Sequence, residues 1–397
     1  MFLPVTKDDM LARGWDEVDF VYVCGDAYVD HPSFGAAIIT RVLENNGFTV
    51  AFLAQPDWHL IDDFTRFGRP RLGFLVSSGN IDSMVAHYTV AKRRRRDDAY
   101  SPGGISGKRP DRAVDVYCRC IREAYGDIPI VIGGLEASLR RFAHYDYWSD
   151  SVHPSILISS DADLLIFGMG ERQITEIAER LRNGEKTDEM RDIRGVCYAC
   201  DVKETPFTVV ECPSFANVSE NKREYAVAAR IQQDEQDFFR GRVIKQRHGK
   251  RMVVQNIPAE PLTSKELDGV YELPYMRTYH PMYEKDGGVP AIKEVEFSVT
   301  HNRGCFGGCN FCSIAFHQGR YVVARSKESI IKEAKLLTTL PNFKGYIHDV
   351  GGPTANFRRP SCNSQEVHGL CKGKKCLAPT PCKNLVADHT EYIDILR

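Results

Sequence analysis

Three cysteines in one short segment have the clearest potential for chemistry in this chain. Cys305, Cys309 and Cys312 follow the spacing C-x3-C-x2-C. Three thiolates on one loop suit a [4Fe–4S] cluster and leave one iron without a protein ligand, open to a small molecule that chelates through an amine and a carboxylate. A structural zinc site usually takes four ligands in two pairs, and the next cysteine is Cys362. The spacing favours an iron–sulfur cluster over a zinc site or three unrelated thiols.

The segments on either side of the cysteines predict the frame that positions them. Residues 292–300 alternate apolar and polar side chains and predict a strand. Residues 326–340 carry apolar residues at helical spacing behind a serine N-cap and predict a helix. Gly304, Gly307 and Gly308 allow tight turns between the two elements. The cysteines are therefore expected on a long loop between a strand and a helix.

The first half of the chain repeats a pattern of strand, glycine turn and helix, which is typical of a parallel sheet covered on both faces. We predict a Rossmann-like, flavodoxin-like α/β domain over residues 1–205. Ligands in such sheets bind at the carboxyl ends of the strands. The predicted strands are residues 19–26, 48–53, 71–77, 128–132 and 163–167, and the predicted helices are residues 32–46 and 173–181. The candidate ligand-binding turns are Gly25-Asp26, 77–80, Gly133-Gly134 and 168–171.

Residues 206–290 differ in character and predict a linker between two domains. Residues 215–239 form a polar helical pattern, and residues 243–255 read as a hairpin that turns at Gly249. Beyond the linker, residues 345–350 predict a second strand in the C-terminal part, and Gly351-Gly352-Pro353-Thr354 follows it.

A second cysteine group lies in residues 362–382. Cys362, Cys371, Cys376 and Cys382 stand close together among proline and glycine residues. This density indicates a second metal site, either structural zinc or an auxiliary iron–sulfur cluster, and the alternative is four free loop thiols.

Composition limits the classes of protein to consider. The 397 residues are 43% hydrophobic and 26% charged, which is typical of a soluble protein too long for one core. The net charge of −1 gives no bulk attraction to nucleic acid or to a membrane. The basic run 92–96 is followed by two aspartates, so a solvated loop is favoured over an RNA contact, although nucleic acid is not excluded. Thirteen cysteines without an export signal or a transmembrane run indicate the cytoplasm.

The cysteine loop resembles that of the radical S-adenosylmethionine (SAM) superfamily, with Phe311 just before the last cysteine. The resemblance implies that the loop follows the first strand of a partial (βα)6 barrel and that the open iron binds SAM. It further implies reductive cleavage of SAM to a 5′-deoxyadenosyl radical, with hydrogen abstraction or methyl or methylthio transfer as the outcome. An electron donor such as flavodoxin or ferredoxin and an unknown substrate are the implied partners. SAM contacts are expected from Phe311, Gly351, Gly352, Pro353 and Thr354.

Longer strings resemble the YgiQ family of radical SAM proteins. They are residues 25–35 (GDAYVDHPSFG), 97–104 (DDAYSPGG), 133–141 (GGLEASLRR) and 351–356 (GGPTAN). The order of the glycine turns also resembles the cobalamin-binding domain that precedes many such barrels. Residues 30–35 do not match the Asp-x-His-x-x-Gly loop that carries the lower cobalamin ligand, so cobalamin is allowed but not favoured.

Residues 291–397 are then expected to form the first part of the barrel, with a cysteine-rich insertion at 362–382. One βα unit takes roughly 30 residues, so a six-unit barrel would extend beyond this sequence, which is expected to be truncated and to hold its cluster poorly. The alternative function is a structural or redox-sensing protein that holds iron–sulfur or zinc, without radical chemistry and with RNA as a candidate partner. A structural metal site would not need Gly351-Gly352 one strand after the cysteines.

Overall fold

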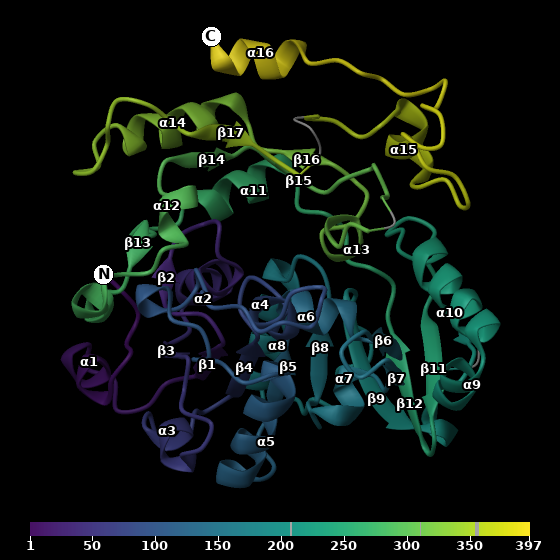
Figure 1. Ribbon diagram of the computed structural model, residues 1–397, viewed down its shortest axis with the longest axis horizontal. Helices are drawn as coiled ribbons and strands as arrows, with labels where there is room; N and C mark the ends of the chain where they lie inside the picture. Colours follow the sequence, from purple (N-terminus) through teal and green to yellow (C-terminus); the bar gives the residue numbers. More distant parts are fainter. Residues whose placement is uncertain (207–208, 310, 354–356) are drawn as a thin grey trace.

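A nine-stranded sheet forms the lower part of the molecule in Figure 1. The structure is a computed structural model that describes residues 1–206, 209–309, 311–353 and 357–397. The strands lie in the order β10-β11-β12-β9-β8-β5-β4-β1-β3. In that order their bounds are Val210–Cys212, Ile244–His248, Arg251–Gln255, Val196–Asp201, Leu164–Ile166, Ile130–Ile132, Gly73–Ser77, Phe20–Cys24 and Val50–Ala54.

Strands β3, β1, β4, β5 and β8 are parallel. Numbered along the chain, these five strands have the spatial order 2-1-3-4-5, which is the flavodoxin-like order. The prediction of a flavodoxin-like sheet is confirmed, and each strand predicted for it lies within two or three residues of its place. The order reverses between β1 and β4, which is where such sheets usually bind ligands.

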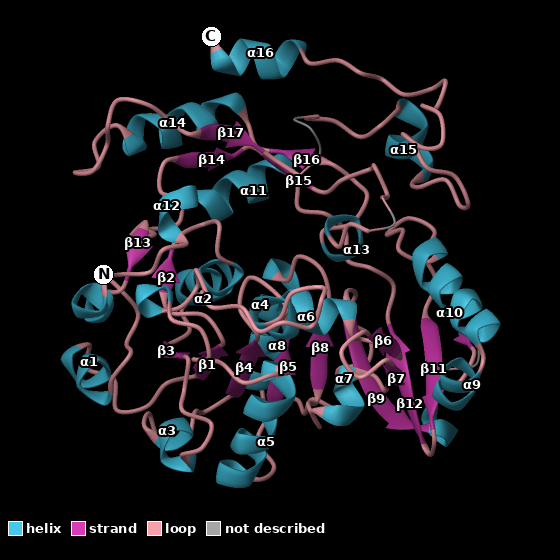
Figure 2. Ribbon diagram, in the orientation of Figure 1, coloured by secondary structure: helices cyan, strands magenta, loops and turns pink. Residues whose placement is uncertain are grey.

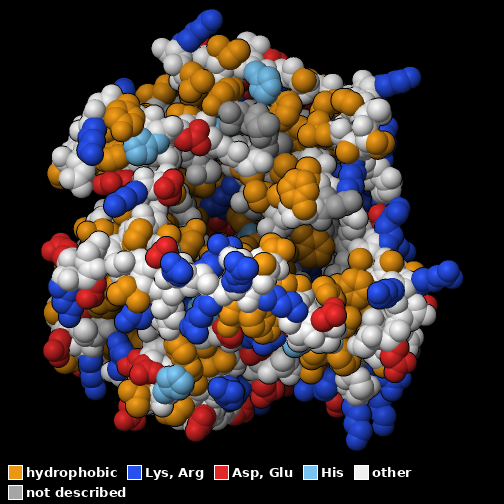
Figure 3. Space-filling view, viewed as in Figure 1, with side chains coloured by type: hydrophobic (Ala, Val, Ile, Leu, Met, Phe, Trp, Pro, Cys, Tyr) orange, Lys and Arg blue, Asp and Glu red, His pale blue; other side chains and the backbone are white. Residues whose placement is uncertain are grey.

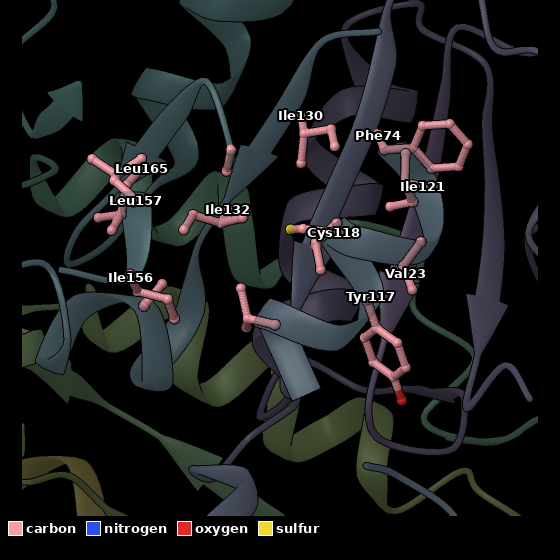
Figure 4. Close-up of a cluster of buried hydrophobic side chains, with 14 of the residues drawn as sticks. Val23, Phe74, Tyr117, Cys118, Ile121, Ile130, Ile132, Ile156, Leu157 and Leu165 are labelled. Atoms are coloured by element: carbon pink, nitrogen blue, oxygen red, sulfur yellow. The ribbon is translucent and has the colours of Figure 1, made fainter. Parts of the chain in front are cut away.

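Helices cover both faces of this parallel part (Figures 1 and 2). Helices α2 (Gly35–Asn45) and α8 (Glu171–Arg182) pack on one face. The other face carries α3 (Ile61–Thr65), α5 (Ala113–Tyr125), α6 (Gly134–Leu139) and α7 (Ile156–Ser159). Figure 4 shows Cys118 of α5 among the buried side chains of this second core. The remaining elements of the first 205 residues are α1 (Lys7–Ala12), β2 (Val29–Asp30), α4 (Ser83–His87), β6 (His144–Asp146) and β7 (Ser151–His153), with 3-10 turns at Pro102–Gly104 and Val202–Glu204.

The hairpin predicted at 243–255 is present as β11 and β12, but it is not part of a free linker. Strand β12 pairs antiparallel with β9, so the hairpin extends the sheet. The backbone groups at the edge of β9 gain partners in this way, which protects the edge. The helix predicted over 215–239 is divided into α9 (Phe215–Glu220) and α10 (Lys222–Asp234), because Asn221 ends the first and caps the second.

The C-terminal part lies above the sheet in Figure 1. Strand β14 (Ser298–Thr300) pairs parallel with β17 (Asp349–Gly351), and α14 (Lys327–Leu337) connects them, which makes one βα unit. The other elements are α11 (Ser264–Tyr271), β13 (Thr278–Tyr279), a 3-10 turn at Pro281–Asp286, α12 (Ile292–Val295), β15 (Asn302–Arg303), α13 (Ile314–His317), β16 (Val323–Ala324), α15 (Asn363–His368) and α16 (Thr390–Leu396).

The strand predicted over 292–300 is wrong in its first half. Residues 292–295 form the short helix α12, and Ile292 is buried in a core of the sheet domain. Only Phe297 and Val299 enter the small core below α14. The alternating pattern therefore spans a junction between two cores.

Each helix in the described ranges is too short or too polar to cross a bilayer.

Replacement of Phe74 by alanine should strongly weaken the sheet domain. Phe74 lies on β4, the middle one of the five parallel strands, and is 0% exposed. Loss of a buried phenyl ring costs ~3–5 kcal/mol in the free energy of unfolding. Urea unfolding followed by circular dichroism measures this loss. Phe239→Ala, at a ring that is 48% exposed, is the control and should lose far less. Equal losses would contradict the assignment of this core.

Candidate functional site

The point where the strand order reverses is filled by the chain itself. Arg109, which is buried, lies there with its guanidinium 2.7 Å from an Asp26 oxygen and 2.8 Å from an Asp98 oxygen. It also donates to the carbonyl of Ser78 over 3.0 Å. Burial raises the pKa of Asp26 to about 6, although Arg109 opposes the rise. The long loop after β4 therefore closes the usual ligand position between β1 and β4.

A cavity of about 450 Å³ lies further along the strand ends, between the sheet domain and the C-terminal part. Figure 3 shows the molecule hollowed between these two parts. Three of the four predicted ligand turns line the cavity, namely those that follow β4, β5 and β8, whereas Gly25-Asp26 does not. The opposite wall includes Thr300, Asn302, Arg303, Ser313 and Pro353. The sheet thus presents its strand ends to the segments that flank the cysteine loop.

A buried ion pair fixes the start of the cysteine loop. Arg303 on β15 donates through Nη1 to Glu171, the first residue of α8, and both side chains are buried. The guanidinium also lies over the ring of Tyr271, 5.2 Å from its centroid. Gly304 follows with a φ of +83°, and a Cβ there would lie 2.0 Å from the carbonyl oxygen of Tyr321. The backbone therefore turns into the loop at a position where only glycine fits.

The three loop cysteines are free thiols at the surface. Cys305 and Cys312 are half-buried, and Cys309 is exposed. A Cβ added at Gly307 would lie 3.4 Å from Sγ of Cys305 and 3.8 Å from Sγ of Cys309, so this glycine leaves space between the two sulfurs. Within the described ranges, no three His, Cys, Asp or Glu side chains are close enough to share a single metal ion. The preference for a [4Fe–4S] cluster over zinc therefore rests on the C-x3-C-x2-C spacing of the loop.

Helix α13 begins directly after the loop and is anchored to the sheet domain. Phe316 lies under the guanidinium of Arg141, with 4.1 Å between the guanidinium carbon and the ring centroid. Nδ1 of His317 lies 2.9 Å from Oγ of Ser138. Burial, with the nearby charge of Arg141, lowers the pKa of His317 to about 4, so its ring is neutral near pH 7. Both ends of the cysteine loop are thus held by the sheet domain.

The turn after β17 approaches an unsatisfied amide. A Cβ at Gly352 would lie 1.5 Å from Oδ1 of Asn302, so the backbone needs glycine here. Asn302 is 0% exposed, and in the described part of the chain neither atom of its amide has a hydrogen-bond partner. Pro353 lines the same cavity. These residues offer polar groups to a ligand beside the cysteine loop. Thr354 lies outside the described residues.

Phe311 is placed differently from the other predicted SAM contacts. Its ring is 92% exposed and does not line the 450 Å³ cavity. It lies instead beside a shallow depression with Cys309 and Cys312. Its contact with the cofactor stays a prediction.

The second cysteine group is brought together only in part. Oγ of Ser361 lies 3.9 Å from Sγ of Cys362 and 3.3 Å from Sγ of Cys376. Cys382 donates its backbone N–H to the carbonyl of Cys376 over 2.8 Å, whereas Cys371 is exposed. Hydrogen bonds from the backbone of Asn384 and from Lys374 lower the pKa of Cys382. A second metal at these residues stays a prediction.

His31 belongs to the segment compared with the cobalamin loop, and it does not face the cavity. Its ring is 0% exposed, and Nδ1 accepts the backbone N–H of Ser33 over 3.1 Å. Burial and the charge of Arg277 lower its pKa to about 3. Pro32 and Ser33 line the cavity but His31 does not.

Sequence reasoning missed Arg109, Asn302, and the pairing of Arg303 with Glu171. Arg303 and Glu171 both stand in quoted segments, beside the first cysteine and at the end of 168–171. Their charge and the adjacent glycines could have marked each of them as a candidate site residue. Their pairing could not be predicted, because a contact between residues 132 positions apart leaves no local sequence pattern.

Comparison with known proteins identifies similar sequences and folds. A family profile described as Radical SAM N-terminal matches residues 2–298. A "UPF0313 protein" of Clostridium botulinum (strain Okra / Type B1) is 58% identical over 399 residues, covering 100% of this chain and 62% of the relative. One from Clostridium perfringens (strain ATCC 13124) is 57% identical over 397 residues, covering 100% of this chain and 60% of the relative. The chain thus spans about three fifths of the curated relatives it matches.

Among solved structures, the chain is similar to the radical SAM methyltransferase TsrM from Kitasatospora setae, with tryptophan substrate and a SAM analog bound. The identity is 17% and the TM-score 0.43, over 85% of this chain and 47% of that chain. A second structure of TsrM, with cobalamin and a [4Fe-4S] cluster bound, has an identity of 16% and a TM-score of 0.44 over the same shares.

Gly304→Ala should displace the cysteine loop and lower its capacity for iron. The added methyl group meets the carbonyl oxygen of Tyr321 at a backbone that cannot move without disturbing β15. Gly319→Ala is a matched control, because its φ of +88° is similar but nothing lies within 4 Å of the added Cβ. After anaerobic reconstitution, iron per chain should fall severalfold in Gly304→Ala and little in Gly319→Ala. The same iron content in both variants would contradict the loop geometry.

His31→Asn should reduce the acid sensitivity of the fold. Buried His31 stays neutral in the folded state down to about pH 3, whereas in the unfolded chain a histidine gains a proton below ~6.5. Its stabilisation is therefore fully present above pH ~6.5 and is lost as the pH falls from there toward 3. Between pH 7 and 5 the loss is about 2 kcal/mol in the free energy of unfolding. Asn keeps an acceptor for the N–H of Ser33.

Urea unfolding at pH 7 and pH 5 measures this difference. His59→Asn, at an exposed histidine, is the control and should keep the wild-type pH dependence. An unchanged pH dependence in His31→Asn would show that His31 is not buried in its neutral form.

Proposed function

Because the chain belongs to the Radical SAM N-terminal family, we propose that it forms part of an enzyme that binds a [4Fe–4S] cluster through Cys305, Cys309 and Cys312 and binds SAM beside it. The observation that carries the proposal is the placement of the loop. It begins at the buried Arg303–Glu171 pair, and the adjacent cavity is lined by Pro353 and by Asn302, whose amide has no hydrogen-bond partner in the described residues. The resemblance to the YgiQ family and the UPF0313 relatives agree with this assignment.

The residues of the chain have separable tasks in this proposal. The three thiolates would ligate the cluster, and Gly307 leaves space between the sulfurs. When bound and reduced, such a cluster would supply the electron for cleavage of SAM. Asn302 and the carbonyl groups of the turn at Gly351-Gly352 orient the polar end of the SAM methionine. Phe306 is 0% exposed and shields the inner side of the loop from water.

We further propose an acidic electron donor, such as a flavodoxin or a ferredoxin, as partner. The exposed ring of Phe311 and the exposed Cys309 lie on the outer side of the loop. Lys375 lies close to Gly308, with its Cγ 3.7 Å from a Cβ built there. An apolar side chain beside a basic group suits a negatively charged protein surface.

The second candidate is a metal-holding protein without radical chemistry, structural or redox-sensing, with RNA as a candidate partner. The approach of Cys362 and Cys376 to Ser361 favours it, because such a cluster of thiols needs no SAM. The response of the iron site to SAM separates the two candidates.

Cys305→Ala/Cys309→Ala/Cys312→Ala should abolish the SAM-responsive cluster. We expect the wild type, reconstituted anaerobically, to gain iron toward about four per chain, with the incomplete occupancy that the sequence predicts, and to show an electron paramagnetic resonance spectrum that changes when SAM is added after dithionite. The triple variant should lose both properties. Cys371→Ala, at an exposed thiol of the second group, is the control and should keep them.

Two outcomes of this experiment decide between the candidates. A wild-type iron site that ignores SAM would favour the structural or redox-sensing protein. A SAM-responsive spectrum in the triple variant would contradict the assignment of the three ligands. Zinc or iron retained by the triple variant would assign a second site to Cys362, Cys371, Cys376 and Cys382.

A further inference from the structure

Arg141 is a buried cation with an incomplete set of partners. It ends the GGLEASLRR string and is 1% exposed. Nε donates to Oε1 of Gln255 over 2.6 Å, and Nη1 donates to the carbonyl of Ser138. Nη2 has no hydrogen-bond partner in the described residues. Because Nη2 carries two hydrogens, two donor positions of this guanidinium are open.

No described carboxylate balances the charge of Arg141, since none lies within ion-pair distance of it. Burial lowers the pKa of Arg141 to about 10, so the guanidinium is charged near pH 7. The rings of Phe167 and Phe316 cover its faces, at 5.0 Å and 4.1 Å from the guanidinium carbon. Aromatic faces offset part of the cost of burying a cation, but they leave its edge without an acceptor. The adjacent Arg140, in contrast, lies 2.7 Å from a carboxylate oxygen of Asp82.

A cavity of about 100 Å³ adjoins this guanidinium. It is separate in its lining from the cysteines and lies between the sheet domain, the strand pair β15–β16 and helix α13. Gln236 and Gln173 also line it. Nε2 of Gln236 and Oε1 of Gln173 have no hydrogen-bond partner in the described part of the chain. Much of the remaining wall is apolar, with Met169, Phe238, Pro261, Leu262, Leu267 and Leu370.

We propose that this cavity binds a small organic carboxylate with an apolar body. One carboxylate oxygen accepts from Nη2 of Arg141, and Nε2 of Gln236 supplies a second donor. Gln173 can accept a hydrogen bond from a donor on the ligand. A single negative charge balances the guanidinium of Arg141, while Arg320, which also lines the cavity without a described carboxylate partner, donates to the carbonyl of Lys374. A phosphate dianion is more costly to desolvate than a carboxylate where much of the wall is apolar. The inference goes beyond the proposed function, because binding requires neither a cluster nor SAM.

Binding of the ligand would also affect the helix α13 that follows the cysteine loop. It would contact Arg141 at the edge of the guanidinium that covers Phe316, and Phe316 is four residues after Cys312. Binding would therefore stabilise the contact between α13 and the sheet domain.

Isothermal titration calorimetry with benzoate tests the proposal on the chain as it exists, without reconstitution. Benzamide is the neutral analogue of the same shape, and phosphate tests the alternative anion, all at matched ionic strength. We expect benzoate to bind, benzamide and phosphate to bind at least tenfold more weakly, and Arg141→Met to reduce benzoate affinity by roughly tenfold or more. Arg180→Met is the control, because Arg180 lies on α8 outside the cavity and pairs with Asp192; its benzoate affinity should equal that of the wild type.

A second variant keeps the test decisive if Arg141→Met does not fold. Gln236→Leu removes the other donor and leaves the buried guanidinium in place, and it should weaken benzoate severalfold. Absence of benzoate binding by the wild type would overturn the proposal. Equal affinity for benzamide, preference for phosphate, or binding unchanged in both variants would also overturn it.

Discussion

The buried ion pair between Arg303 and Glu171 is the interaction on which the placement of the cysteine loop depends. It joins the residue before Gly304 to the first residue of α8, where a carboxylate is also favoured by the helix dipole. Removing either partner would leave a buried charge without compensation, which costs ~3–5 kcal/mol. A second buried network, in which Glu333 binds Arg277 and Arg325, holds α14 to the segments before and after the loop. The chemistry-bearing segment is therefore positioned by charges inside the molecule more than by its own short strands.

The strands have the flavodoxin-like order, but the position where such sheets commonly bind ligands is filled by the chain itself. Arg109, between Asp26 and Asp98, occupies the place between β1 and β4 where such sheets commonly bind ligands. The open space lies instead beyond β4, β5 and β8, facing β15 and α13. The sheet domain consequently acts as one wall of a site that the C-terminal part completes.

The sequence predicted the local elements well because their patterns are local. Glycine turns after short apolar runs identified the parallel strands, and the spacing of the cysteines identified the loop. The same reasoning failed where tertiary contacts determine the strand pairing or the secondary structure. The hairpin at 243–255 looked like part of a linker because nothing in it shows that β12 pairs with β9. Residues 292–300 looked like one strand because burial of Ile292 in one core and Phe297 in another gives the same alternation. The contacts Arg303–Glu171 and Arg141–Phe316 join residues 132 and 175 positions apart, and no spacing rule predicts them.

The arrangement of the sheet has a consequence for the order in which the protein can be assembled. All nine strands are contained in the first 255 residues, and the first cysteine of the loop comes 50 positions later. Domains generally fold from the N-terminus during synthesis, so the sheet can close on the ribosome while the cysteines are not yet made. In that order of events, Glu171 belongs to a folded domain before Arg303, its ion-pair partner, has been synthesised. The cysteines would thus be synthesised when the wall that holds both ends of their loop, through Glu171 and Ser138, is already formed.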